Sequence, residues 1–139
     1  MTPYNKPLPQ IDPRQARFWQ GLRERQIWLP TCANCAKVRF PATRFCGHCW
    51  SDESHWQQVQ GGATLQAYAT FHKAYWAGFA ADVPYRVIQV RLDAGVSLFS
   101  NLVGPWPPAL AQGARLKPFF DDVTPEVTLL KFCVDEANP

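Results

Sequence analysis

Apolar and polar positions follow a helical rhythm near the start of the chain. In PRQARFWQGLRERQI, residues 13–27, apolar side chains recur at helical spacing and the other positions are mostly polar or basic. The apolar side of this predicted helix consists of Phe18, Leu22 and Trp19. Gly21 lowers helix propensity inside the pattern, so the stretch is predicted to form one helix or two short ones. The proline-rich residues 1–13 predict an extended arm.

From residue 63 onward the rhythm changes to a period of two, which is typical of strands. Five such runs are separated by glycine, proline or aspartate: residues 65–71, 85–92, 94–103, 113–120 and 127–134. Strict alternation places Leu65, Ala67, Ala69 and Phe71 on one face of the first run, and Ile88, Val90 and Leu92 on one face of the second. The predicted fold class is therefore mainly β, with an N-terminal helix or helices and a five-stranded, closed or nearly closed OB-type barrel.

The segments between these elements predict a division into three parts. They are an arm and helical segment (1–30), a cysteine module with a linker (31–60) and the barrel (61–139). The stretch SDESHWQQVQGG, residues 51–62, is polar and ends in a glycine pair that suits a turn, so it is predicted to be the linker. The barrel contains a long aromatic loop, residues 72–84, at a connection that often lines the ligand face of OB-type barrels.

The composition permits a packed core. Hydrophobic residues make up 47% of the chain and charged residues 18%, so extensive disorder is not expected. The polar N-terminal stretch does not resemble a signal peptide, and no run approaches the roughly 18 apolar residues of a membrane span. The chain is therefore predicted to be cytoplasmic, where cysteines stay reduced.

Charge is divided unevenly along the chain. Residues 1–50 carry eight Lys or Arg and two acids, a net charge of +6, whereas residues 51–139 carry six and nine, a net charge of −3. The basic end suits a nucleic acid, an acidic protein surface or a phosphorylated ligand. A solvated, arginine-rich helix beside a metal module is the competing interpretation, and the sequence leaves both open.

Four cysteines form the pattern that carries the clearest chemistry. The stretch TCANCAKVRFPATRFCGHCW contains the spacing C-x2-C-x10-C-x2-C. The predicted metal ligands are Cys32, Cys35, Cys46 and Cys49. Four thiolates satisfy tetrahedral Zn²⁺ without an open position, so a structural zinc ion is predicted, ahead of an iron or Fe–S centre or a redox dithiol. Five cysteines in a reducing compartment fit a disulfide framework poorly.

Other chemically capable residues give weaker signals. His48 and His55 lie near the second cysteine pair and are alternative metal ligands, although two regular Cys-x-x-Cys pairs fit better. Cys133 lies in an alternating strand and is predicted to be a small buried hydrophobe. Acid–base chemistry by residues of the aromatic loop competes with the simpler interpretation of a solvent-exposed loop. The loop residues concerned are His72, Lys73 and Asp82.

The order of these parts resembles a known family. FWQGL, the CANC…RFPATRFCGHC module and PYRVIQVRLDAGV are similar to the zinc-ribbon/OB-fold family described as acyl-CoA-associated, over residues 12–135. The resemblance implies a rubredoxin-like zinc ribbon between N-terminal helices and an OB barrel. It also implies an auxiliary subunit that accompanies thiolase-like, hydroxymethylglutaryl-CoA-synthase-like or MaoC-like enzymes and helps to accommodate the acyl-CoA.

The leading functional hypothesis is therefore a non-catalytic subunit of an acyl-CoA-processing, thiolase-like acyltransferase complex. Residues of the aromatic loop and the next strand are candidates for contact with acyl-CoA or with the partner: Lys73, Tyr75, Trp76, Phe79 and Tyr85. Basic residues of the helical segment are candidates for contact with partner acids or CoA phosphates: Arg14, Arg17, Arg23 and Arg25. The alternatives are a single-stranded nucleic-acid-binding module, which needs a basic aromatic strand face, and a stand-alone acyl-CoA enzyme acting through the aromatic loop.

Overall fold

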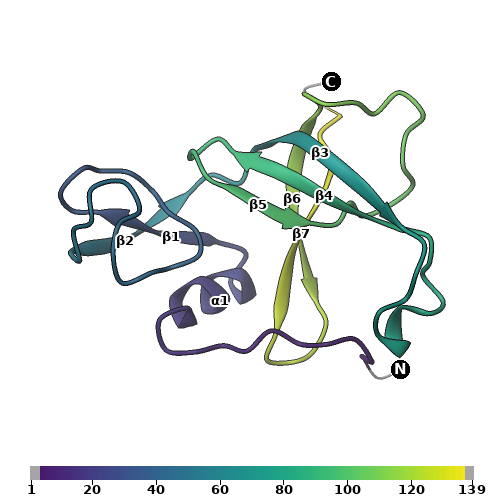
Figure 1. The fold of residues 1–139 in the computed structure, drawn as a ribbon, viewed down its shortest axis with the longest axis horizontal. Helices are drawn as coiled ribbons and strands as arrows, with labels where there is room; N and C mark the ends of the chain where they lie inside the picture. Colours follow the sequence, from purple (N-terminus) through teal and green to yellow (C-terminus); the bar gives the residue numbers. More distant parts are fainter. Residues whose placement is uncertain (1–3, 137–139) are drawn as a thin grey trace.

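The structure, a computed structural model, describes residues 4–136 and is mainly β (Figure 1). Its elements in chain order are α1 (Ala16–Arg23), β1 (Ile27–Cys32), β2 (Ser54–Val59), β3 (Ala63–Phe71), the 3-10 turn η1 (Ala77–Phe79), β4 (Tyr85–Leu92), β5 (Ser97–Ser100), β6 (Arg115–Asp122) and β7 (Thr128–Val134). The strands form a two-stranded ribbon, β1–β2, and a five-stranded sheet. In Figure 1 the helix lies beneath the junction between ribbon and sheet.

The N-terminal helix is shorter than the sequence predicts, and it is a single helix. It ends at Arg23 because Arg25 adopts a left-handed backbone with φ of 63°. The backbone N–H of Arg25 then bonds the Leu22 carbonyl at 3.1 Å, and that of Gln26 bonds the Gly21 carbonyl at 2.8 Å. This is the Schellman arrangement that terminates helices. The prediction of a helix through residue 27 is wrong, since the chain has already turned into β1.

Gly21 is a packing glycine and not a break between helices. A Cβ atom at this position would lie 2.7 Å from Cδ1 of Trp28 and 3.0 Å from the Gln26 carbonyl oxygen. Only a residue without a side chain allows the helix and the start of β1 to approach so closely. Phe18 and Leu22 are buried, as predicted for the apolar face, and join the same core as the barrel strands.

The stretch predicted to be a linker contains strand β2. All six residues of β1 pair with β2, from Ile27 opposite Val59 to Cys32 opposite Ser54. The sequence concealed this strand because most of its residues are polar and exposed, and only Trp56 and Val59 pack against the core. The linker interpretation of residues 51–62 is therefore wrong. The glycine pair, Gly61 and Gly62, connects β2 directly to β3.

The five-stranded sheet forms the predicted OB-type barrel, which is nearly closed. Its strand order is β5-β4-β3-β6-β7, with antiparallel neighbours throughout. A parallel bridge between Leu102, just beyond β5, and Phe132 of β7 brings the two edges together. The barrel core includes residues with no accessible surface: Ile88, Val90, Leu92, Leu116 and Phe132. The predicted common face of the second run is thus confirmed.

The predicted face of the first barrel strand is wrong in its second half. The register of β3 and β4 shifts between Leu65, opposite Val90, and Ala67, opposite Gln89. This bulge at Gln66 inverts the alternation, because beyond it Tyr68 lies opposite the buried Ile88 and Thr70 lies opposite Arg86. All four residues of this end of the strand, 67–70, are exposed. Tyr68 and Thr70 consequently lie on the same face as Leu65.

Among the described residues, no helix is long and apolar enough to cross a membrane.

Candidate metal centre and barrel cavity

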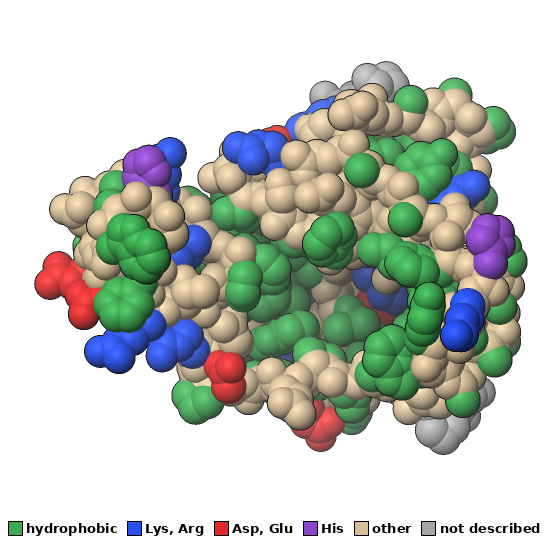
Figure 2. Space-filling view, viewed as in Figure 1, with side chains coloured by type: hydrophobic (Ala, Val, Ile, Leu, Met, Phe, Trp, Pro, Cys, Tyr) green, Lys and Arg blue, Asp and Glu red, His purple; other side chains and the backbone are tan. Residues whose placement is uncertain are grey.

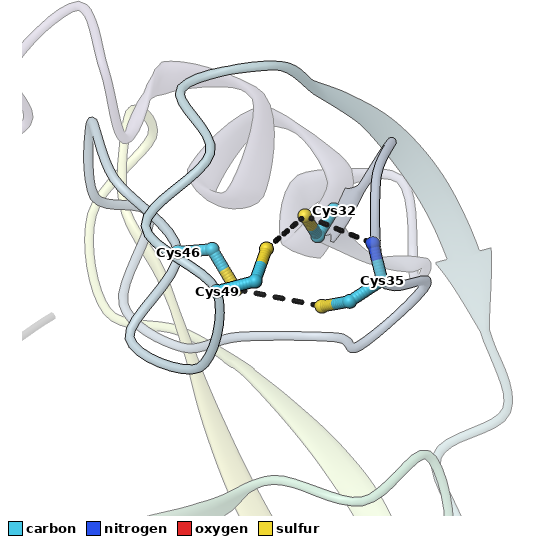
Figure 3. A group of neighbouring side chains, drawn as sticks. All are labelled: Cys32, Cys35, Cys46 and Cys49. Carbon is cyan, nitrogen blue, oxygen red and sulfur yellow. Dashed lines mark hydrogen bonds between the residues drawn. The ribbon is translucent and has the colours of Figure 1, made fainter.

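The four predicted ligand cysteines converge in the ribbon. Their side chains point toward one another from two separate loops (Figure 3). The Sγ atoms of Cys32 and Cys49 lie 3.5 Å apart, those of Cys35 and Cys46 lie 3.7 Å apart, and all four lie within 4.8 Å of one another. Sulfurs bound at about 2.3 Å to a tetrahedral Zn²⁺ would be separated by roughly 3.8 Å. The donor set and its spacing therefore fit a zinc ion, and neither His48 nor His55 belongs to the group.

Each cysteine pair lies on the same kind of tight turn. The Ala36 N–H bonds the Cys32 carbonyl at 3.0 Å, and the Trp50 N–H bonds the Cys46 carbonyl at 2.9 Å. Ala36 and Trp50, which follow the second cysteine of each pair, have φ of 65° and 66°. This left-handed conformation is costly for any residue except glycine. The backbone N–H of Asn34 points at Cys32 Sγ at 3.4 Å and that of His48 at Cys46 Sγ at 3.4 Å, an arrangement that favours the thiolate form.

The electrostatics of the cluster favour cation binding. Backbone N–H groups of Cys49 and His48 lower the pKa of Cys46 to about 6. The Asn34 side chain, 3.4 Å from Cys49 Sγ, lowers the pKa of that thiol. The Lys37 backbone N–H also lowers the pKa of Cys35, but burial and the neighbouring thiols together raise it to about 11. Four thiolates at these distances repel one another, and a divalent cation compensates for that repulsion.

A second candidate site is a cavity of about 950 Å³ between the barrel and the N-terminal arm. Figure 2 shows the corresponding hollow, with hydrophobic side chains around it and charged side chains inside. The lining comes from the arm, the end of β3, the aromatic loop, β4, the segment after β5, and the β6–β7 hairpin. We call this the barrel cavity. Its size is typical of small-molecule sites, and its connections correspond to the ligand face of OB-type barrels.

The barrel cavity contains some of the predicted loop residues and excludes others. Phe79 and Tyr85 line it, with stacked rings 5.1 Å apart. Tyr75 and Trp76 are exposed and lie outside the lining, with the Lys73 ammonium 5.1 Å above the Tyr75 ring. The aromatic loop therefore has an inner wall and an outer surface, which the sequence did not distinguish.

The N-terminal arm packs against this loop. The Lys6 ammonium lies 2.9 Å from the Asp82 carboxylate and 5.4 Å from the centre of the Phe79 ring. The Asn5 carbonyl occupies the place that a Cβ atom at Gly78 would need. Asp82 thus forms an ion pair with the arm instead of facing His72 in an acid–base pair. His72 is exposed, and Cys133 is only half-buried on β7.

Several side chains of the barrel cavity carry no clear signal in the sequence pattern. These residues are Arg86, Trp106, Asp121, Leu129 and Lys131. Lys131 bonds Asp121 at 2.7 Å across β6 and β7. A lysine within the apolar run VTLLKFCV was an available signal, because an unpaired cation is rarely placed inside a packed strand.

Two of the four basic residues of the helical segment, Arg17 and Arg25, form contacts within the fold. The Arg25 guanidinium bonds the Asp122 carboxylate, and the Arg17 guanidinium carbon lies 4.1 Å from the centre of the Trp28 ring. Arg14 and Arg23 are exposed, and neither takes part in an ion pair within residues 4–136.

Comparison with known proteins gives matches to both halves. The rubredoxin-like zinc ribbon domain of ChsH2 matches residues 19–54, and the C-terminal OB-fold domain of ChsH2 matches residues 56–121. A solved structure described as an Ltp2–ChsH2 (DUF35) aldolase is similar over 91% of this chain and 98% of that chain, with 28% identity and a TM-score of 0.78. A DUF35-family protein of unknown function from Sulfolobus solfataricus has the same fold, with 21% identity and a TM-score of 0.64 over 88% of this chain and 86% of that chain.

One curated relative is a probable enoyl-CoA hydratase alpha subunit from Thermomonospora curvata. It is 30% identical over 127 residues, which are 91% of this chain. The chain spans only 39% of the length of that relative. The similarity therefore extends over the ribbon and barrel and leaves most of the longer protein unmatched.

Proposed function

Because the chain belongs to the ChsH2 family of rubredoxin-like zinc-ribbon and OB-fold proteins, we propose that it is a non-catalytic auxiliary subunit of an acyl-CoA-processing complex. The catalytic partner in this proposal is a thiolase-like acyltransferase or a related acyl-CoA enzyme. The observation that carries the proposal is the match to 98% of a chain in the Ltp2–ChsH2 aldolase structure at a TM-score of 0.78. The relative named as a hydratase subunit supports the same class of assembly.

The proposal assigns one structural Zn²⁺ to Cys32, Cys35, Cys46 and Cys49. When bound, zinc would cross-link the two loops and supply the ribbon with stability that its small core lacks. Four protein sulfurs complete a tetrahedral shell, so no position is left for water or substrate. In this proposal the zinc ion has a structural role in holding the ribbon together for partner binding, and it has no catalytic role.

A lack of organised catalytic groups supports the auxiliary role. Within residues 4–136, the loop acid Asp82 forms an ion pair with Lys6. His72, the first residue after β3, is exposed to solvent. Lys131 is likewise held by Asp121. A general base needs a free side chain within reach of substrate and a second group that orients it. We therefore place the chemistry on the partner subunit.

An exposed aromatic patch supports docking through the ribbon. We define the ribbon tip as Arg44, Phe45 and Trp50, which flank the second cysteine turn. Trp50 and Phe45 are 76% and 45% exposed, and the Arg44 guanidinium carbon lies 5.2 Å from the centre of the Phe45 ring. Trp and Arg dominate the binding energy of many protein interfaces. A rigid metal-bound turn would present them with a smaller loss of backbone conformational entropy on binding.

Co-expression with the acyl-CoA enzymes encoded beside this chain tests the proposal. The expected result is a stoichiometric complex on size-exclusion chromatography, with acyl-CoA turnover that falls when this chain is omitted. The isolated chain should show no turnover. A chain that remains alone with every neighbouring enzyme, or that converts acyl-CoA by itself, would contradict the proposal.

A further inference from the structure

Arg86 differs from the other cations of the barrel cavity. Lys6 forms an ion pair with Asp82 at 2.9 Å, and Lys131 forms one with Asp121 at 2.7 Å. None of the ion pairs in residues 4–136 involves Arg86. The lining therefore contains one more cation than acids, and Arg86 carries the charge that no carboxylate balances.

The exposed Arg86 side chain lies beside two aromatic rings. The guanidinium carbon lies 4.3 Å from the centre of the Trp106 ring and 5.5 Å from that of the Tyr68 ring. The two rings are themselves 4.9 Å apart and tilted by 60°. A guanidinium that lies over aromatic rings keeps the N–H donors along its edge free, and these donors fit a carboxylate or phosphate bidentately. The arrangement preorganises Arg86 for an anion.

The backbone around Arg86 is also fixed. Its carbonyl accepts a hydrogen bond of 2.8 Å from the Asn101 side chain, and Thr70 lies directly opposite it in β3. Arg86, Asn101 and Thr70 all line the barrel cavity. The bulge in β3 is what turns Thr70 and Tyr68 toward this face, since an unbroken alternation would direct them outward.

Apolar groups cover other parts of the same cavity. Phe79 and Tyr85 form a stacked wall, and Leu102, Val123 and Leu129 contribute aliphatic surface. Such a lining suits the burial of an apolar ligand body, whereas one preorganised guanidinium suits a single anionic group.

We propose that the barrel cavity binds an amphipathic organic anion, an apolar body that bears a carboxylate or phosphate, with Arg86 in contact with the anionic group. The apolar body contacts Phe79, Tyr85 and the aliphatic wall. This inference deepens the proposed function and rests on it only for the biological source of the ligand. Binding by the isolated chain requires no partner, so failure to bind and failure to assemble are separate results.

Isothermal titration calorimetry on the zinc-loaded full chain tests the inference. The probes are decanoate, decanoyl-CoA and decanol, which share an apolar chain and differ in the anionic group. The variant is Arg86→Gln, and the matched control is Arg91→Gln, which removes an exposed cation of the same strand outside the cavity lining. Thermal unfolding of both variants checks that the fold is retained.

At least one anionic probe should bind more tightly than decanol. Arg86→Gln should weaken that probe by about 10- to 100-fold, the range expected for a lost charged hydrogen-bond pair, and leave decanol unchanged. Arg91→Gln should bind like the wild type, and Arg86→Lys should fall between wild type and Arg86→Gln. Tighter binding of decanoate assigns the carboxylate as the anion, and tighter binding of decanoyl-CoA assigns the phosphates. Equal binding of anions and decanol, equal loss in both glutamine variants, or no binding to folded protein would overturn the proposal.

Discussion

Arg25 and Asp122 join the end of the N-terminal helix to the barrel through a bidentate ion pair. Nη1 of Arg25 donates to Oδ1 of Asp122 at 2.8 Å, and Nη2 donates to Oδ2 at 2.6 Å. The Thr128 hydroxyl donates to Oδ1 at 2.6 Å and so fixes the carboxylate from the other side. Arg25 is also the left-handed residue that ends α1, so one residue both stops the helix and attaches it to β6.

This contact predicts a stability change in acid. Hydrogen bonds from Arg25, then from Thr128, lower the pKa of Asp122 from 3.8 to about 2. The folded state binds the proton less readily than the unfolded state, so this stabilisation is fully present above the unfolded pKa and is lost as pH falls through about 2. We expect the midpoint of thermal unfolding to fall over this window in the wild type and to fall less in Asp122→Asn.

A matched comparison isolates this contribution. The pKa of Asp93 is also lowered, mainly by the hydrogen bonds that Arg115 donates to it, so the Asp122→Asn variant retains an acid dependence from this second site. The control is Glu126→Gln, an exposed acid in the β6–β7 turn, which should keep the wild-type pH profile. If the unfolding midpoint depended on pH identically in Asp122→Asn and the wild type, the ion pair would make no contribution to the acid dependence of stability.

Removal of the metal should unfold the ribbon. The two cysteine loops have little core of their own, and structural zinc contributes about 10–16 kcal/mol in small zinc-finger peptides. We expect one zinc ion per chain in elemental analysis of the wild type. Cys32→Ser should reduce that stoichiometry, lose near-ultraviolet circular dichroism and release the catalytic partner.

Cys133→Ser is the control for the metal experiment, because Cys133 lies on β7 outside the four-cysteine group. It should retain full zinc content and partner binding. A Cys32→Ser protein that keeps both its fold and its partner without metal would contradict the structural role of zinc.

Gly21→Ala should destabilise the protein, although alanine is the better helix former. The added Cβ would lie 2.7 Å from Trp28, whose indole N–H bonds Gln26 at 2.8 Å and whose ring is covered by Arg17. Trp28 cannot move without losing these contacts. Overpacking costs about 1–3 kcal/mol, and helix propensity returns roughly 1 kcal/mol.

Urea unfolding measures the balance between these two effects. Net destabilisation of about 1 kcal/mol is expected. The control is Gly47→Ala, where an added Cβ meets nothing within 4 Å, so its effect should be small. A more stable Gly21→Ala protein would mean that helix propensity outweighs the contact with Trp28.

The sequence was informative where one residue type determines the local chemistry. The spacing of Cys32, Cys35, Cys46 and Cys49 is a local property of two turns, and the fold brings their sulfurs within 4.8 Å. The alternation in β4 likewise predicted the buried Ile88, Val90 and Leu92, because a regular strand has a period of two. These patterns depend on neighbours close in sequence.

Features that depend on distant segments could not be predicted. The bulge at Gln66 reverses the exposed face of β3, and no local pattern marks it. Arg86 and Trp106 are separated in sequence by a strand and a proline-rich loop, yet the Arg86 guanidinium carbon lies 4.3 Å from the centre of the Trp106 ring. The tertiary fold alone determines these pairings, which is why the cavity was recognised only in part.

Trp50 offers a test that separates partner binding from folding. It is 76% exposed and holds φ of 66°, a conformation that costs a non-glycine residue about 1–2 kcal/mol. Trp50→Gly removes both the ring and the strain, and the greater freedom of glycine in the unfolded state offsets part of this gain by about 0.5–1 kcal/mol. We expect a protein that is more stable by about 0.5–1 kcal/mol and yet binds its catalytic partner at least about 10-fold more weakly.

Two companion variants complete this test. Trp50→Ala removes the ring but keeps the strained backbone, so it should lose partner affinity without the gain in stability. Ala36→Gly relieves the equivalent strain in the first cysteine turn, where φ is 65°, and should gain stability with unchanged affinity. Urea unfolding and calorimetric titration with the partner measure the two quantities separately. Full partner affinity in both Trp50 variants would exclude the ribbon tip from the interface, since a dominant interface aromatic cannot be removed without weakening the complex.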